Sequence, residues 1–129
     1  MKILIAEDEE ALATILRDEL VRAHYAVTVA RDGVEALRAA RKNVPDLILL
    51  DLLMPRKDGF EVLRELKADA ALKAVPVIIL SNLAQDQDVR RGLDLGAVDY
   101  LEKVQLPLKQ VVEKVRAYLS EPRELPEEK

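Results

Sequence analysis

The sequence predicts an α/β fold in which a parallel sheet is covered by helices on both faces. Three short runs, Ile3–Ala6, Leu47–Leu50 and Val77–Leu80, are apolar at every position. Unbroken apolar strands are typical of a parallel sheet that is buried on both sides. Longer segments with apolar residues at helical spacing lie between these runs. The strand–helix unit occurs five times, which favours right-handed crossovers and one sheet.

Each element can be justified in chain order. After the first strand, a helix is expected from about residue 9 to residue 23. The runs Val27–Val29 and Val98–Leu101 are shorter and more mixed, which suits the two edge strands. The last helix has the clearest apolar stripe and is predicted to end near Ser120. The apolar positions that predict the five helices are Leu12, Ile15, Leu16 and Leu20, then Val34, Leu37 and Ala40, then Phe60, Leu63 and Leu66, then Val89 and Leu93, then Leu108, Val111, Val112, Val115 and Leu119.

Length and composition exclude several classes of protein. The chain has 129 residues, 20 Lys and Arg against 24 Asp and Glu, a net charge of −4, and no Cys. We expect one domain over residues 1–120 and a charged, disordered tail over residues 121–129. The charge balance argues against a broad nucleic-acid surface, and the lack of Cys excludes disulfides and thiolate metal sites. No apolar run approaches the roughly 20 residues of a membrane span, and the acidic start is unlike a signal peptide. A cytoplasmic protein without membrane insertion is therefore expected.

Polar side chains follow the apolar runs, at the point where each predicted strand ends. Glu7 and Asp8 follow the first strand, Asp51 the third and Ser81 the fourth. Lys103 follows the fifth strand after one intervening residue. In open α/β sheets, ligands bind outside the carboxyl ends of the strands. We therefore expect three carboxylates, a hydroxyl and an ammonium to meet at one edge of the sheet.

Each of these residues also has a simpler interpretation. Asp8 is well placed to cap the first helix, and acids are common at helix starts. Asp51 and Ser81 are typical of turns at strand ends, and Lys103 of a solvated surface. The single histidine, His24, has no partner in the sequence and is expected to be solvated. The convergence of five groups at strand ends favours a functional site over these separate roles.

Clustered carboxylates repel one another, so a proton or a cation must hold them together. Magnesium binds oxygen ligands and needs only one or two carboxylates, with waters and phosphate oxygens completing its shell. An aspartate in such a cluster can attack a phosphoryl group and form an acyl phosphate. Lys103 would neutralise charge on the transferring group, and Ser81 would donate a hydrogen bond to its oxygens. The cluster therefore suits phosphoryl transfer to an aspartate.

Four stretches resemble the receiver domain of two-component response regulators. They are MKILIAEDEE, LILLDLLMPRKDGFEVL, VPVIILSN and LGAVDYLEK, and the similarity covers residues 2 to about 119. The stretch D-x-x-M-P-x-x-D-G, preceded by an acidic pair, is quite specific. The resemblance implies a flavodoxin-like (βα)5 fold with strand order 2-1-3-4-5. It also implies that Asp51 accepts a phosphoryl group from a histidine kinase or a histidine phosphotransfer protein.

The same resemblance implies roles for the other site residues. Asp8, Asp51 and the backbone carbonyl of Leu53 would ligate Mg²⁺, and Glu7 would act through water. Ser81 and Lys103 match the hydroxyl and the lysine that act with Asp51 in the family, and Tyr100 matches its aromatic switch residue. We expect Tyr100 to turn inward in the activated form.

The resemblance also implies how such a protein signals. Phosphorylation would switch the surface formed by the fourth helix, fifth strand and fifth helix, which would contact a downstream protein and through which two copies can pair. We expect no DNA-binding or enzymatic segment after the fifth helix. We therefore expect a single-domain regulator that does not bind nucleic acid directly. We expect it to catalyse only its own phosphorylation and dephosphorylation.

Two positions depart from the family pattern. Val104 follows Lys103 where proline is usual, and Asn82 stands where a small residue is common. A cis bond before a non-proline residue costs about 2.5–4 kcal/mol, so we expect the bond between residues 103 and 104 to be trans. These departures leave open a receiver-like interaction module that works without phosphate. A flavin- or nucleotide-binding flavodoxin-like protein is a third alternative, but the acids from Glu7 to Glu10 would repel a phosphate.

Overall fold

The computed structural model of the chain describes residues 1–82, 86–103 and 107–124. Its five strands form one parallel sheet in the order β2-β1-β3-β4-β5, which confirms the predicted topology. The elements in chain order are β1 (Lys2–Ala6), α1 (Glu10–Arg22), β2 (Ala26–Ala30), α2 (Gly33–Lys42), β3 (Leu47–Asp51), α3 (Gly59–Ala68), β4 (Val77–Ser81), α4 (Asp86–Asp94), β5 (Asp99–Glu102) and α5 (Leu108–Glu124).

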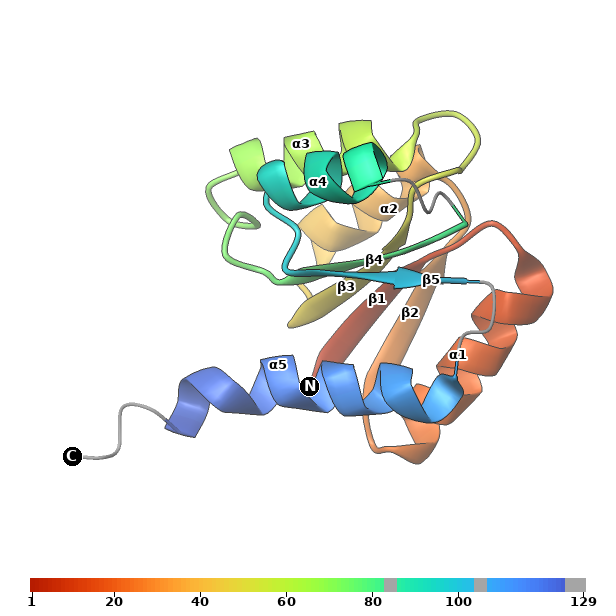
Figure 1. Ribbon diagram of the computed structural model, residues 1–129. Coiled ribbons are helices and arrows are strands. Elements are labelled where there is room, and N and C mark those ends of the chain that lie inside the picture. The colour runs from red at the N-terminus through yellow and green to blue at the C-terminus, as the bar shows by residue number, and fades with distance from the viewer. Residues whose placement is uncertain (83–85, 104–106, 125–129) are drawn as a thin grey trace.

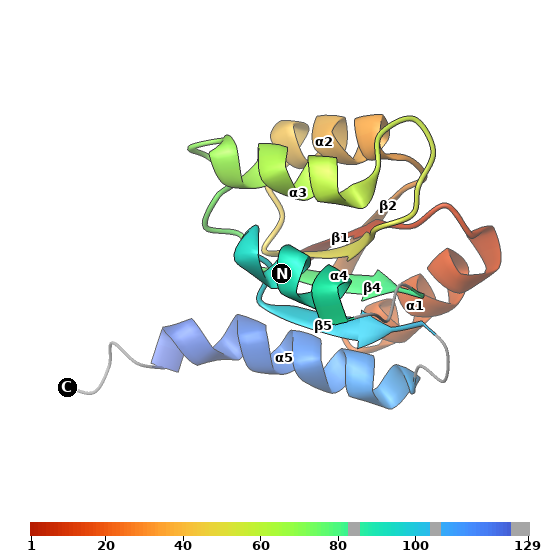
Figure 2. The ribbon, with the colours of Figure 1, turned by 45° about the horizontal axis from the view of Figure 1, so that its top comes forward.

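The helices cover both faces of the sheet, as expected. Figure 1 shows α2, α3 and α4 on one face and α1 and α5 on the other, and the turned view in Figure 2 agrees. Successive residues of β1 face opposite sides: Leu4 and Ala6 join the core beneath α2 and α3, and Ile3 and Ile5 the core beneath α1 and α5. The continuous apolar runs of the sequence are therefore strands with two buried faces.

Strand position explains the composition of the strands. β1 is paired on both sides, so that Ile5 lies opposite Val29 of β2 and Leu49 of β3. Every residue of β3 and β4 is buried, whereas β2 and β5 contain partly exposed positions. The more mixed composition of β2 and β5 is confirmed as a property of edge strands.

Two helices of the α2–α3 face begin at Asp-Gly pairs. The Asp32 carboxylate accepts a hydrogen bond from the Glu35 N–H at 2.8 Å, and Asp58 accepts one from the Glu61 N–H at 3.0 Å. An aspartate at this position satisfies a backbone N–H that the first turn leaves without a partner. At the start of α1 the capping position is occupied by Glu9, whose side chain makes no capping bond. Asp8 is therefore not the cap of this helix, and that alternative is wrong.

Two side chains that apolar spacing predicted to be buried are exposed in the structure. Ile15 is 45% exposed and Leu93 is 43% exposed, although both were expected on buried faces. α4 instead approaches the sheet through Gly92, where a Cβ atom would lie 2.5 Å from Cδ1 of Ile79. A contact made by a glycine leaves no apolar signal in the sequence.

The end of α5 also differs from the prediction. The helix continues to Glu124, four residues beyond its predicted end near Ser120. The rest of the predicted tail lies outside the described residues. Within the described ranges, no helix is both long and apolar enough to span a membrane.

Candidate functional site

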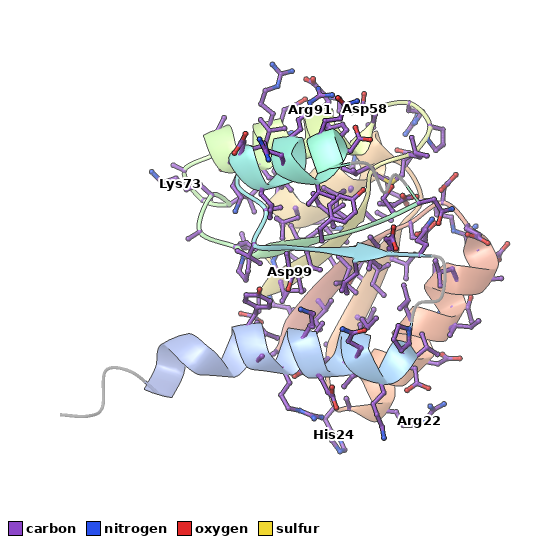
Figure 3. All side chains as sticks on the ribbon, viewed as in Figure 1. Arg22, His24, Asp58, Lys73, Arg91 and Asp99 are labelled. Atoms are coloured by element: carbon purple, nitrogen blue, oxygen red, sulfur yellow. The ribbon has the colours of Figure 1, made fainter. Side chains whose placement is uncertain are left out.

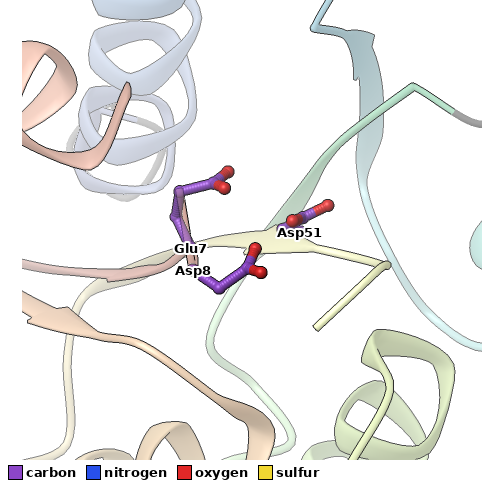
Figure 4. A group of neighbouring side chains, drawn as sticks. All are labelled: Glu7, Asp8 and Asp51. Carbon is purple, nitrogen blue, oxygen red and sulfur yellow. The ribbon is translucent and has the colours of Figure 1, made fainter. Parts of the chain in front are cut away.

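The predicted site residues lie at the carboxyl edge of the sheet. Asp51 and Ser81 are the last residues of β3 and β4, and Glu7 directly follows β1. One carboxylate oxygen from each of Glu7, Asp8 and Asp51 lies within 4.8 Å of the others, and Figure 4 shows the three side chains converging. The parallel sheet therefore brings together residues 44 positions apart in the chain, because strands β1 and β3 are neighbours.

Lys103 joins two of these carboxylates. Its Nζ atom lies 2.9 Å from Oε2 of Glu7 and 3.1 Å from Oδ2 of Asp51. Both carboxylates are buried, with 1% and 2% of their surface exposed. The third acid, Asp8, is exposed. The lysine therefore does not belong to the solvated surface but compensates two buried negative charges.

The electrostatics follow from this burial. Burial raises the pKa of Glu7 and of Asp51, and hydrogen bonds from the Glu9 and Leu53 N–H groups and from Lys103 lower it only in part. Burial would lower the pKa of Lys103, but its contacts with Glu7 and Asp51 outweigh that effect and raise it. One ammonium faces three carboxylates, so the cluster keeps an excess of negative charge.

The donor set fits a hard cation. Oε1 of Glu7 is a buried oxygen with no hydrogen-bond partner among the described residues. A buried carboxylate oxygen without a donor is unfavourable unless a cation or water supplies the missing interaction. All available ligands in the cluster are oxygens, which suits magnesium better than a softer metal. Glu7, Asp8 and Asp51 could therefore hold Mg²⁺.

Ser81 and Tyr100 form a second part of the site. The Ser81 side chain is fully buried at the end of β4. Burial raises the pKa of the Tyr100 hydroxyl, and a side-chain hydrogen bond with Ser81 lowers it in part. Tyr100 is therefore already turned toward the site in this structure. The sequence predicted that orientation only for an activated form.

The loop after β3 is tied to Asp51 by backbone contacts. The Leu53 N–H donates to Oδ1 of Asp51 at 3.2 Å, while the Leu53 side chain is 54% exposed. The Gly59 N–H donates to the Leu52 carbonyl at 2.8 Å. A Cβ atom on Gly59 would lie 2.5 Å from the carbonyl oxygen of Asp51, so only glycine fits there. Gly59 is the last residue of the D-x-x-M-P-x-x-D-G stretch, but its close approach to Asp51 has no signal in the sequence.

Three further features belong to the loops around the site. The backbone N–H of Glu9 donates to Oε2 of Glu7 at 3.0 Å and orients that carboxylate, a role that residue type does not reveal. Asn82 is exposed at the end of β4. The predicted trans bond between Lys103 and Val104 lies outside the described residues.

Comparisons with known proteins place the chain in a family. A family model described as the response regulator receiver domain matches residues 3–116. The chain belongs to the response regulator receiver family. Receiver domains are regulatory modules of two-component signalling.

Individual relatives support the same assignment. The alkaline phosphatase synthesis transcriptional regulatory protein PhoP of Bacillus subtilis is 40% identical over 118 residues, which cover 92% of this chain and 48% of PhoP. The chain spans about half, or less, of the length of the curated relatives it matches.

Solved structures of receiver domains share the fold. A Francisella response regulator receiver domain has a TM-score of 0.87 and 31% identity, over 94% of this chain and 98% of that one. The receiver domain of the sensor histidine kinase PA1611 of Pseudomonas aeruginosa has a TM-score of 0.84 and 30% identity, over 92% of this chain and 97% of that one. That structure has a magnesium ion coordinated in its active-site cleft.

Proposed function

We propose that Asp51 accepts a phosphoryl group from a histidine kinase or a histidine phosphotransfer protein. The observation that carries this proposal is the Lys103 bridge, which lies 3.1 Å from Oδ2 of Asp51 and ties that buried carboxylate to Glu7. A buried aspartate beside a lysine and two further acids is poorly explained as a stabilising pair, because the cluster keeps excess negative charge. It is well explained as an acceptor site for a phosphoryl group and its counter-ion.

The chain's own residues would act in the following way. A carboxylate oxygen of Asp51 attacks phosphorus as the bond from phosphorus to the donor imidazole nitrogen breaks, and the electron pair stays on that nitrogen. Lys103 neutralises charge on the phosphoryl oxygens. The Ser81 hydroxyl has one proton to donate and lone pairs to accept, so it can donate to the phosphoryl group while accepting from Tyr100.

The metal ligands of this proposal are the carboxylates of Asp8 and Asp51 and the backbone carbonyl of Leu53, with Glu7 acting through water. When bound, Mg²⁺ would neutralise negative charge on the transferring group. The unpartnered Oε1 atom of Glu7 and the magnesium in the related PA1611 receiver domain support this assignment. The same site would later release the phosphoryl group to water.

We further propose that phosphorylation changes the surface formed by α4, β5 and α5, by a shift between two conformations that already exist. The Tyr100 bond to Ser81 supports this, because it joins β5 to the site. Two contacts join α5 to β5 within this surface. Lys114 Nζ lies 2.8 Å from Oδ2 of Asp99, and the Tyr118 hydroxyl donates to the same carboxylate at 3.0 Å. In this proposal the domain works in the cytoplasm, passes its signal to a protein target, and pairs with a second copy through this surface.

Intact-mass measurement tests the central step. The chain is incubated with Mg²⁺ and acetyl phosphate, and the wild type is expected to gain the mass of one phosphoryl group. Asp51→Asn should not gain it, whereas Asp18→Asn, which changes an exposed aspartate of α1, should behave like the wild type. No gain in the wild type would instead favour the interaction module that works without phosphate. An equal gain in Asp51→Asn would place the phosphoryl group on another residue.

A further inference from the structure

An aromatic contact joins α3 to α4 at some distance from the acidic cluster. The guanidinium carbon of Arg91 lies 4.0 Å from the centroid of the Phe60 ring. The contact spans a cleft of about 280 Å³ between the two helices, which Asp58, Phe60, Glu61, Arg64, Arg91 and Leu95 line. Figure 3 shows Arg91 and Asp58 near one another at the top of the molecule, and both line the cleft. This Phe60–Arg91 stack, the bridge between α3 and α4, lines the cleft, and its Phe60 ring also packs in the core beneath α2 and α3.

The Phe60 end of the bridge is fixed to the Asp51 strand. Phe60 directly follows Gly59, whose N–H bonds to the Leu52 carbonyl at 2.8 Å. The Gly59 Cα also lies so close to Asp51 that an added Cβ atom would be 2.5 Å from the Asp51 carbonyl oxygen. This hydrogen bond and the close approach of Gly59 tie the first turn of α3, which carries Phe60, to the backbone around Asp51.

The Arg91 end of the bridge moves with α4. The next residue, Gly92, lies against Ile79, and a Cβ atom on it would also be 4.0 Å from Cδ2 of Tyr100. Among the residues that the structure describes, Arg91 makes no ion pair, whereas Arg64 of the same cleft is hydrogen-bonded to Glu61. The Phe60 ring is thus the group that the Arg91 guanidinium contacts. A cation above an aromatic face is attracted by the quadrupole of the ring.

We propose that Arg91 is a positioning residue for the phosphorylation site: its stack on Phe60 links the position of α4 to the loop that follows Asp51. This inference rests on the proposed function of Asp51. The link differs from the Ser81–Tyr100 bond, because it reaches α4 through α3 and not through β4 and β5. Both contacts are made in the same conformation here, so the stack stabilises the conformation in which Tyr100 is bonded to Ser81.

Linkage makes the proposal measurable. If phosphorylation favours this conformation, a contact that stabilises it must also increase the affinity of Asp51 for a phosphoryl group, because coupling between two sites is reciprocal. A contact of equal strength in both conformations would change stability but not that affinity. The dissociation constant for a phosphoryl analogue therefore distinguishes a positioning role from a merely structural one.

The experiment measures beryllofluoride affinity in saturating Mg²⁺ by NMR titration of the full chain. Arg91→Met keeps the aliphatic part of the side chain and removes the cation. We expect binding to weaken about two- to fivefold, which is about 0.4–1 kcal/mol at about 1.4 kcal/mol per tenfold change. Arg90→Met removes the same charge from an exposed neighbour on α4 and should leave the affinity unchanged.

Two further variants complete the test. Phe60→Leu should weaken beryllofluoride binding to a similar extent. The double variant Phe60→Leu with Arg91→Met should bind at least as tightly as the single variant that has the lower affinity. Arg91→Met that melts at a lower temperature but binds beryllofluoride like Arg90→Met would overturn the proposal, as would tighter binding. If the wild type itself does not bind beryllofluoride, the proposed function of Asp51 has failed, and that outcome is separate from a failure of the Arg91 link.

Discussion

Replacing Lys103 by methionine is the sharpest perturbation of the acidic cluster. The substitution removes the ammonium that bonds to Glu7 at 2.9 Å and to Asp51 at 3.1 Å, and it keeps a side chain of similar length. Two buried carboxylates then face one another and Asp8 without a compensating charge. We expect the free energy of unfolding to fall in the absence of Mg²⁺ and to recover in part when Mg²⁺ supplies positive charge at the same place.

The size of the loss follows from burial. Removing one partner of a buried ion pair costs about 3–5 kcal/mol, because a charge is left buried and unpaired. The cluster lies at the edge of the sheet and Asp8 is exposed, so solvent lowers this to about 2–3 kcal/mol near neutral pH. For a domain of this size, about 3–5 °C of melting temperature corresponds to each kcal/mol. Lys103→Met should therefore melt roughly 6–15 °C below the wild type in the metal-free state.

The pH dependence has a definite sign. Burial raises the pKa of Glu7 and of Asp51 in the folded protein. Such groups contribute stability that is complete below their unfolded pKa, about 4, and is lost as the pH rises through the folded pKa. Lys103 lowers both values, so its removal raises them further and moves the loss to higher pH. The stability gap between variant and wild type should therefore be larger at about pH 8 than at about pH 5.

Thermal melts at both pH values, in chelator or in millimolar Mg²⁺, measure these effects. Lys73→Met is the matched control, because it removes an exposed lysine of the loop between α3 and β4 (Figure 3). The control should change stability by less than about 0.5 kcal/mol. A Lys103→Met variant as stable as Lys73→Met in chelator at about pH 8 would refute the reasoning, because the two carboxylates would then need no compensating charge.

Three other predictions follow from the described residues. Mg²⁺ at a hundredfold excess over its dissociation constant should stabilise the fold by about 2.7 kcal/mol in thermal melts, and an equal shift in Asp8→Ala would count against the metal site. His24 has a φ angle of 78° two residues after Arg22, the last residue of α1, so His24→Gly should raise the free energy of unfolding in urea by about 0.5–1 kcal/mol, and a decrease would contradict this. Leu53 is exposed and apolar, so its side chain cannot orient an attacking water. Leu53→Asn combined with Leu83→Glu should speed the loss of phosphate from Asp51 about tenfold, which corresponds to a barrier lower by about 1.4 kcal/mol. Leu83 lies outside the described residues. Equal decay of the phosphorylated wild type and double variant, followed after removal of the donor, would refute that last prediction.

Much of the fold was predictable because burial on two faces leaves a simple signal. The runs Leu47–Leu50 and Val77–Leu80 are apolar without interruption, and both prove to be central strands. The residues after such runs meet at one edge, because parallel strands all end on the same side. That rule alone brought Asp51 and Ser81 into the predicted site, and the structure places both of them there.

The remaining features depend on contacts that sequence spacing does not encode. Nothing in the sequence shows that Lys103 bonds to two carboxylates at once, because the partners come from strands that are distant along the chain. The α4 helix approaches the sheet through Gly92, so an apolar pattern placed Leu93 on the wrong face. The stack of Arg91 on Phe60 has no signal in the sequence, because it depends on how α3 and α4 are packed.

The most direct test of the central claim locates the phosphoryl group on the chain. Borohydride reduces an acyl phosphate to an alcohol, so an aspartyl phosphate becomes homoserine at the modified position. After incubation with acetyl phosphate and Mg²⁺, reduction and peptide mass mapping should find homoserine at position 51 and an unmodified carboxylate at Glu7 and Asp8. Reduction at Glu7 or Asp8 with Asp51 intact, or no reduction at any of the three, would contradict the account.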